Sequence, residues 1–198
     1  MARPQNTEKR VELLHQVVAY VQRHGLAGLS LSPLAAEIGT TKRMLLYYFG
    51  SREQLLARAL AESRPDARAM FDGVADTEGL RRAADGLWEA ITVGEQAGPI
   101  RMLLQLLSLA ATHPEQYGGL AAETVEVMVG PIADAYVRLG HDGSVARENA
   151  TLLVSGLRGL CLDRLVTGDA ARTDAAARRL IDAAVEPRTA GQPNMPGT

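Results

Sequence analysis

The chain has 198 residues, a formal net charge of −2 and 46% hydrophobic residues, enough apolar side chains for one or two folded domains. Because its net charge is slightly negative, the chain as a whole is not a polycation that binds nucleic acid nonspecifically. Because the sequence has neither an N-terminal signal-peptide pattern nor an apolar span long enough to cross a bilayer, we expect a cytoplasmic protein with no membrane partner. Its one cysteine, Cys161, excludes an intrachain disulfide framework, and we expect it to be a packed apolar residue rather than a redox sensor.

Helical signals run through the whole chain, which is rich in Ala, Leu and Arg and has almost no alternating β-branched runs. This pattern predicts an all-α fold of about nine helices. An amphipathic helix comes first. A second, short helix follows, because Leu31, Leu34 and Ile38 recur at helical spacing, and Pro33 is tolerated in a first turn that has no hydrogen bond to lose. Ser30 or Ser32 can cap its start.

A tight turn separates this helix from the next one. Gly39 suits the left-handed backbone of a helix end, and Thr40 or Thr41 can cap the helix that starts a few residues later. On that third helix, Leu45 and Phe49 lie four residues apart and can face the core. Two helices joined by so short a turn must cross, which predicts a helix-turn-helix.

The other face of the third helix carries cations, phenols and a thioether. Its side chains are Lys42, Arg43, Met44, Tyr47 and Tyr48. A DNA duplex offers phosphates to Lys and Tyr, guanine edges to Arg, and thymine methyl groups to Met or aromatic rings. A solvated surface would also accept these residues, but the complete helix-turn-helix spacing favours DNA recognition.

A capping box is predicted directly after the third helix. Gly50 ends that helix, and Gln54 follows Ser51 by three residues, which opens a fourth helix over residues 51–70. The helix N-terminus and Arg52 together make an anion site, for which a DNA phosphate is the favoured ligand. The alternative is an ordinary capped helix with an exposed Arg.

The segment from about Thr7 to Leu60 resembles the DNA-binding domain of the TetR family of bacterial transcriptional repressors. The resemblance rests on His24-Gly25, the Leu-Ser-Leu run at 29–31, the turn Ala-Ala-Glu-Ile-Gly-Thr-Thr, the Tyr-Tyr-Phe end of the third helix and Ser51-Arg-Glu. It implies recognition-helix contacts for Thr41, Lys42, Arg43 and Tyr47, and phosphate contacts for Tyr48 and Arg52. The chain departs from the family pattern at two positions: Leu46 replaces a Tyr that usually touches the DNA backbone, and Arg43 replaces a common Gly.

Charge is distributed unevenly along the chain. Residues 1–60 hold eight Lys or Arg against four Asp or Glu, whereas the remainder holds thirteen against nineteen. A basic end of this kind can dock on DNA by releasing counterions, even though the whole chain is acidic.

The rest of the chain predicts a helical body. Helices are expected over residues 77–96, 99–112, 114–139, 144–167 and 173–185, with a kink at Pro131 in the third of these. We therefore expect a DNA-binding domain over residues 7–52, extended by the fourth helix to about 70, and a body over residues 71–186 for effector binding and dimerisation. The tail, residues 187–198, is expected to be disordered.

The family resemblance implies a homodimer and a small-molecule effector. The last two helices, residues about 144–185, would pair with their copies, so that two recognition helices reach the half-sites of a palindromic operator on double-stranded DNA. A small, largely apolar effector would bind the body and release the operator by shifting the hinge between the fourth helix and the body. Candidate pocket residues are Trp88, Met102, Gln105, His113, Tyr117, Met128 and Tyr136.

Enzymatic function is not expected from this sequence. The four histidines lack metal-ligand spacing, Ser155 lacks the glycine pattern of a nucleophile elbow, and no phosphate-cradling glycine loop occurs. We therefore expect no catalytic residue, no metal site and no cofactor. The alternative to an effector-controlled repressor is a DNA-binding adaptor that binds no small-molecule effector and is controlled by a protein partner.

Overall fold

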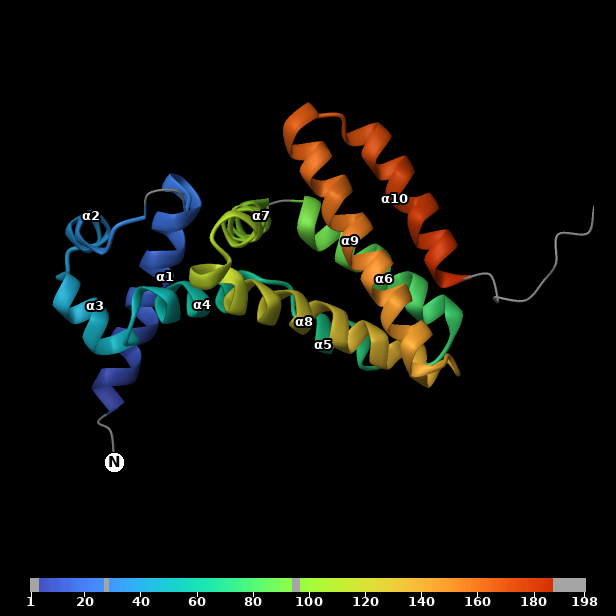
Figure 1. Cartoon of the computed structure of the whole chain (residues 1–198), viewed down its shortest axis with the longest axis horizontal. Helices are drawn as coiled ribbons and strands as arrows, with labels where there is room; N and C mark the ends of the chain where they lie inside the picture. The colour runs from blue at the N-terminus through green and yellow to red at the C-terminus, as the bar shows by residue number, and fades with distance from the viewer. Residues whose placement is uncertain (1–3, 27–28, 94–96, 187–198) are drawn as a thin grey trace, which may run out of the picture. The chain divides into compact units, whose positions relative to one another are not determined.

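The computed structural model describes residues 4–26, 29–93 and 97–186, and the described residues form helices without a β-strand (Figure 1). The all-α prediction is therefore confirmed. The predicted disordered tail, residues 187–198, lies outside the described residues. The helices are α1 (Pro4–His24), α2 (Leu31–Glu37), α3 (Lys42–Phe49), α4 (Arg52–Ser63), α5 (Ala67–Phe71), α6 (Thr77–Thr92), α7 (Ala97–Thr112), α8 (Pro114–Arg138), α9 (Gly143–Thr167) and α10 (Ala170–Val185).

The fourth helix is shorter than the sequence predicts. It ends at Ser63 instead of continuing to residue 70, and the short helix α5 follows separately. Arg64 has extended backbone angles, φ −80° and ψ 153°. The next residue is Pro65, whose ring disfavours a helical conformation in the residue before it. The proline therefore divides the expected helix into α4 and α5.

The described residues form two compact units that are each built from two stretches of chain. Unit 1 comprises residues of 1–66 and 89–127, and unit 2 comprises residues of 67–88 and 128–198. The helix-turn-helix therefore shares a unit with α7 and the first half of α8. Along the chain, unit 2 begins at residue 67, and residues 89–127 belong to unit 1 again. The functional boundaries predicted from sequence, 7–52 extended to about 70 and 71–186, stay predictions.

Unit 1 has one continuous apolar core. Helix α1 packs against α4 and α7, α4 packs against α7, and α3 packs against both α2 and α4. The core side chains of the three crossing helices α1, α3 and α4 include Leu13, Val17, Leu45, Phe49, Leu55 and Leu56, all at most 2% exposed. Met102 and Leu106 of α7 reach the same core. The position of the helix-turn-helix is thus set by packing against α7 as well as against α1 and α4.

Unit 2 is built around the antiparallel pair α9 and α10, which lie side by side in Figure 1. Gly156 leaves room for Leu180 of α10, because a Cβ added at Gly156 would clash with the Leu180 side chain. Helix α8 continues through Pro131, the position of the predicted kink, and its Tyr136 hydroxyl donates a hydrogen bond of 2.8 Å to the carbonyl of Ala184 on α10.

Cys161 lies inside the core of unit 2. It is 1% exposed, and burial raises the pKa of its thiol. A buried thiol with a raised pKa has little thiolate at neutral pH and is therefore a poor nucleophile and a poor redox sensor. The prediction that Cys161 is a packed apolar residue is confirmed.

Candidate nucleic-acid interface

The turn of the helix-turn-helix is formed by hydrogen bonds at the end of α2. Gly39 has φ +69°, a left-handed backbone that glycine adopts without a steric penalty. The amide of Thr40 then donates to the carbonyl of Ala35 over 2.8 Å, which closes the end of the helix. At the start of α2, Ser30 is the N-cap residue, but its side chain makes no capping hydrogen bond.

Helix α3 is fixed at both ends and along one face. The Thr41 side chain accepts a hydrogen bond from the amide of Met44 over 3.2 Å, which caps the N-terminus. Gly50 ends the helix, and its amide donates to the carbonyl of Leu46. Leu45 and Phe49 are buried, so the predicted core-facing pair is confirmed.

The opposite face of α3 is presented to solvent. Lys42, Arg43, Met44 and Tyr47 are exposed, whereas Tyr48 is half-buried and packs against the core of unit 1. Tyr47 is 69% exposed, an unusual position for a tyrosine without a binding role. Its ring meets that of Tyr48 edge to face, with the centroids 5.2 Å apart. This geometry holds one phenol outward and anchors the other at the rim of the core.

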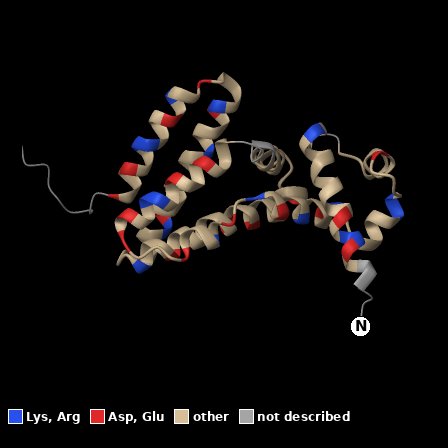
Figure 2. Cartoon of the chain, turned by 180° about the vertical axis from the view of Figure 1, so that it is seen from behind, with Lys and Arg blue, Asp and Glu red and all other residues tan. Residues whose placement is uncertain are grey.

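The charge of α3 is entirely positive. Its two charged residues, Lys42 and Arg43, occupy the first turn, where Figure 2 shows basic residues at the helix start. In contrast, basic and acidic residues alternate along α9 and α10 (Figure 2). The exposed face of α3 therefore combines cations, which attract phosphates and guanine edges, with flat or apolar groups that can contact bases.

The capping box at the start of α4 is present in full. Ser51 accepts from the amide of Gln54 over 3.1 Å, and the Gln54 side chain accepts from the amide of Ser51 over 3.2 Å. Arg52, the predicted phosphate ligand, has a side chain that is 22% exposed. Its Nε donates to the carbonyl of Leu29 and its Nη1 donates to the hydroxyl of Tyr117, each over 3.0 Å.

Four of the candidate pocket residues lie in unit 1, in different surroundings. Met102 is buried in the apolar core, and Gln105 accepts a hydrogen bond from the amide of Leu26. Tyr117 is buried beside Arg52, whereas His113 is exposed at the start of α8, with its Nδ1 2.9 Å from the hydroxyl of Thr112. The polar groups of Gln105 and Tyr117 therefore have partners within the protein.

The remaining candidates lie in unit 2. The indole of Trp88 donates to Asp174 over 2.9 Å, and the guanidinium of Arg164 lies 5.9 Å from the centre of the indole ring. Met128 is buried on α8, and Tyr136 is fully buried on the same helix. The seven predicted pocket residues are thus divided between two units, four in one and three in the other.

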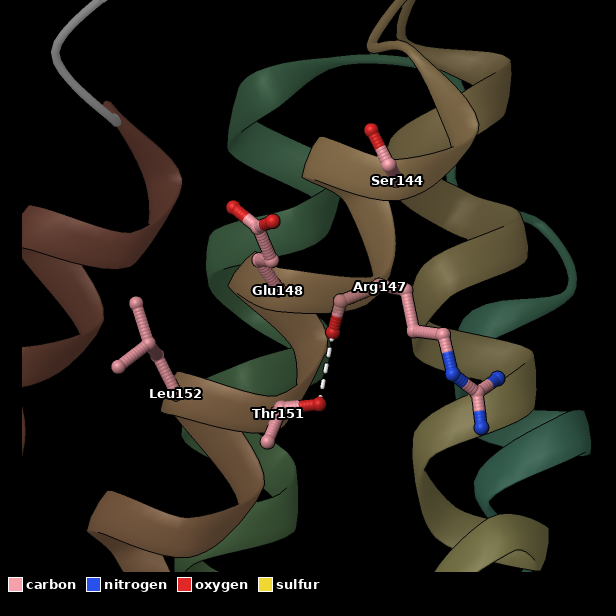
Figure 3. Close-up of a pocket in the computed structure, with 5 residues that line it drawn as sticks. All are labelled: Ser144, Arg147, Glu148, Thr151 and Leu152. Atoms are coloured by element: carbon pink, nitrogen blue, oxygen red, sulfur yellow. Dashed lines mark hydrogen bonds between the residues drawn. The ribbon is translucent and has the colours of Figure 1, made fainter.

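A shallow, open hollow lies on the surface of α9 (Figure 3). It is lined by Ser144, Arg147, Glu148, Thr151 and Leu152, none of which is a predicted pocket residue. In Figure 3, Glu148 and Leu152 project from the same side of α9, while Arg147 extends to the other side. The hollow belongs to an exposed helix face and not to the interior of the bundle.

Within the described ranges 4–26, 29–93 and 97–186, no group of three or more His, Cys, Asp or Glu side chains is arranged to hold a metal ion. No helix in this part of the chain is long and apolar enough to span a membrane.

Comparison with known proteins identifies relatives of the helix-turn-helix and of the whole fold. Residues 13–59 match the profile of the family described as bacterial regulatory proteins, tetR family. A structure from Mesorhizobium loti, classed with the TetR-family transcriptional regulators, matches with a TM-score of 0.69 at 20% identity, over 93% of this chain and 96% of that one. A TetR transcriptional regulator from Legionella pneumophila matches with a TM-score of 0.67 at 17% identity, over 92% and 97% of the two chains.

A third similar structure is that of the multidrug binding protein EbrR in complex with proflavin, with a TM-score of 0.61 at 22% identity over 88% of this chain and 98% of that one. No curated protein sequence matches the chain. Identities this low establish the shared fold, and the profile match lies on the helices that present the basic face of α3. Residues 13–59 therefore resemble bacterial regulatory proteins of the tetR family, and the described residues share the fold of these transcriptional regulators.

Proposed function

We propose that the protein is a repressor that binds a palindromic operator as a homodimer and leaves it when a small, largely apolar effector binds the helical body. The observation that carries this proposal is the outward face of α3, where Lys42, Arg43 and Tyr47 are exposed on a helix that is capped and anchored in a core. Such a rigid, basic and aromatic helix face suits the major groove. The proposal describes a regulator without catalytic activity that acts on DNA in the cytoplasm.

The proposed DNA contacts follow from side-chain chemistry and exposure. Arg43 would read a guanine edge by two hydrogen bonds, and Lys42 would contact a phosphate. Tyr47 would contact bases or sugars, Tyr48 would donate its hydroxyl to a phosphate, and Thr41 would contact DNA beside the helix N-terminus that it caps. For Arg52, a phosphate contact is the alternative to an internal role, since its guanidinium donates two hydrogen bonds inside unit 1.

A homodimer through residues about 144–185 is supported by an exposed stripe on α9. We define the α9 stripe as the exposed residues Val145, Leu152, Gly159, Leu162 and Val166. Four of these positions recur every seven residues, the spacing at which one helix packs along another in a coiled coil. Leu152 is 65% exposed and Val166 is 77% exposed in the single chain. Pairing with a second copy would remove this apolar surface from water.

Effector binding is proposed for the helical body on the basis of fold. The multidrug binding protein EbrR, which shares this fold, was crystallised with proflavin, a flat molecule that is largely aromatic. The candidate pocket residues are those predicted from sequence: Trp88, Met102, Gln105, His113, Tyr117, Met128 and Tyr136. Since five of them already make a polar contact within the protein, an effector would gain most from their apolar surfaces.

The decisive experiment is selection of bound sequences from a random pool of DNA duplexes. A palindrome with half-sites about one helical turn apart or more is expected, because a two-fold dimer presents two recognition helices. Arg43→Ala should weaken binding to the selected operator by about 1 to 3 kcal/mol and relax the preference at one base position. Arg82→Ala, which removes an exposed Arg of α6 in unit 2, is the matched control and should leave binding unchanged.

A selected sequence without two-fold symmetry would contradict the dimeric part of the proposal, and no enrichment would contradict the DNA-binding role of α3. The operator complex also allows the effector to be tested with a panel of small apolar and aromatic compounds. Release of the operator by a member of the panel is expected. Failure of every compound would favour an adaptor that is controlled by a protein partner.

A further inference from the structure

The loop that leads into the helix-turn-helix is held by a side chain of α7. Gln105 Oε1 accepts a hydrogen bond of 2.7 Å from the amide of Leu26, across 79 residues of sequence. The approach is close, since a Cβ added at Gly25, which has φ +77°, would lie 3.0 Å from Gln105 Nε2. Leu26 is 2% exposed, so its amide would carry a desolvation penalty without this acceptor, and the exposed Gln105 side chain thereby ties Leu26 to α7.

Arg52 joins the two ends of the helix-turn-helix. Leu29 precedes α2 and Arg52 follows α3, and the Arg52 Nε donates to the Leu29 carbonyl over 3.0 Å. The α2–turn–α3 segment is therefore closed into a frame by one charge-assisted hydrogen bond. Such bonds are stronger than those between neutral groups and have a defined geometry.

The same guanidinium connects this frame to α8. Arg52 Nη1 donates to the hydroxyl of Tyr117 over 3.0 Å, and the guanidinium carbon lies 5.8 Å from the centre of the Tyr117 ring. Tyr117 is only 6% exposed, and the Arg52 side chain is 22% exposed. Most of this contact is therefore shielded from solvent, which distinguishes it from a flexible surface ion pair.

We propose that Gln105, Arg52 and Tyr117 form a clamp that sets the position of the helix-turn-helix relative to α7 and α8, and that they are positioning residues for operator binding. This inference rests on the proposed function, because it describes how the DNA-reading helix is held. The clamp ties both sides of the α2–turn–α3 segment to residues of α7 and α8 that lie 79 and 65 residues later in the chain. A displacement of α7 or α8 within unit 1 therefore moves the recognition helix as part of a rigid frame.

The clamp predicts a loss of operator selectivity without a loss of phosphate contacts. Nonspecific binding depends mainly on charge, whereas operator binding depends on where two recognition helices are held. Tyr117→Phe keeps the buried ring and removes only the hydroxyl that accepts from Arg52. Gln105→Leu removes the acceptor of the Leu26 amide. Each variant should weaken operator binding about 2- to 10-fold, the equivalent of one hydrogen bond, and leave nonspecific affinity unchanged.

The test measures operator affinity, affinity for random duplex DNA and the salt dependence of both for wild type, Tyr117→Phe, Arg52→Gln and the double variant. Arg52→Gln should weaken operator binding with an unchanged salt slope, and the double variant should lose less than the sum of the two single variants. Tyr20→Phe is the control, because it removes the hydroxyl of another buried tyrosine from the same core, outside the clamp.

If the losses of operator-binding free energy in the two single variants add up in the double variant, the proposed clamp is contradicted. The clamp would also be contradicted if the slope of log affinity against log salt concentration were lower by about 0.9 in Arg52→Gln, because that result makes Arg52 a phosphate ligand. Unchanged affinity for random DNA also shows that each variant is folded. If wild type selects an operator and Tyr117→Phe binds it equally well, only the clamp fails. If wild type selects no sequence, the proposed function fails instead.

Discussion

Gly39 and Gly50 both have a positive φ, but their surroundings differ. Gly39, with φ +69°, has no atom within 4 Å of the position where a Cβ would lie. Gly50 has φ +83° and ψ −76°, outside the left-handed helical region, and a Cβ there would come within 2.0 Å of Gln54 Oε1. That oxygen accepts the capping-box hydrogen bond from the Ser51 amide.

We therefore predict that Gly50→Ala destabilises the protein more than Gly39→Ala does. Gly39→Ala should lower the free energy of unfolding by about 1 kcal/mol, the penalty of a left-handed backbone for a residue with a Cβ. Gly50→Ala should lower the free energy of unfolding by about 3 kcal/mol. The backbone conformation at Gly50 is less favourable for alanine than that at Gly39, and the substitution also removes the capping hydrogen bond. Urea unfolding followed by circular dichroism measures both, and equal losses would show that the Gln54 contact has no energetic role.

At the scale of helices, α8 and α10 are connected through a single buried phenol. The Tyr136 hydroxyl donates to the Ala184 carbonyl, and burial raises the pKa of Tyr136 to about 12. An ionised phenolate could neither donate this hydrogen bond nor be solvated inside unit 2. Tyr136 is therefore a structural connection between the two helices in its neutral form.

This connection predicts a loss of stability at alkaline pH. Between pH 10 and about 12 the unfolded chain ionises Tyr136 while the folded chain keeps it protonated, so the unfolded state binds fewer protons and stability falls as pH rises. Tyr136→Phe should be less stable at neutral pH by about 1 kcal/mol and show a shallower decline over this window. Tyr47→Phe, at an exposed tyrosine, should keep the wild-type slope, and an unchanged slope in Tyr136→Phe would contradict the assignment.

At the scale of the whole molecule, one chain presents one recognition helix and one exposed α9 stripe. Operator recognition by a single helix covers few base pairs, so specificity needs a second copy held at a fixed spacing. The α9 stripe combines large apolar residues with Gly159, which lets a second helix approach closely. Dimerisation and DNA specificity are therefore expected to depend on each other.

We predict that a charge placed in the α9 stripe converts the dimer into a monomer. Leu152→Glu and Leu162→Glu should each lower the mass measured by light scattering at micromolar concentration from that of two chains to that of one, because an unpaired carboxylate would be buried in the interface. Val11→Glu, at an exposed valine of α1, should leave the dimer intact. A dimer that survives both stripe variants would place the interface elsewhere.

The helix-turn-helix could be predicted residue by residue because its signals are local. The Thr41 cap, the Gly39 turn, the buried pair Leu45 and Phe49, and the Ser51 capping box all lie within a few residues of the groups that they contact. Each is a rule of helix geometry that operates over one or two turns. The all-α fold and the likeness of residues 13–59 to the tetR-family profile could be predicted for the same reason.

Arg52 shows what the sequence could not determine. Its position next to a helix N-terminus predicts a phosphate ligand, yet its partners are Leu29 and Tyr117, 23 and 65 residues away. The role of Gln105 at the Leu26 amide likewise has no local signal. The sequence by itself determined the helices, their caps and the basic face of α3, because those depend on short-range contacts. Only the tertiary structure decided which distant polar groups pair, because the packing of helices far apart in the sequence brings Arg52 to Tyr117 and Gln105 to Leu26.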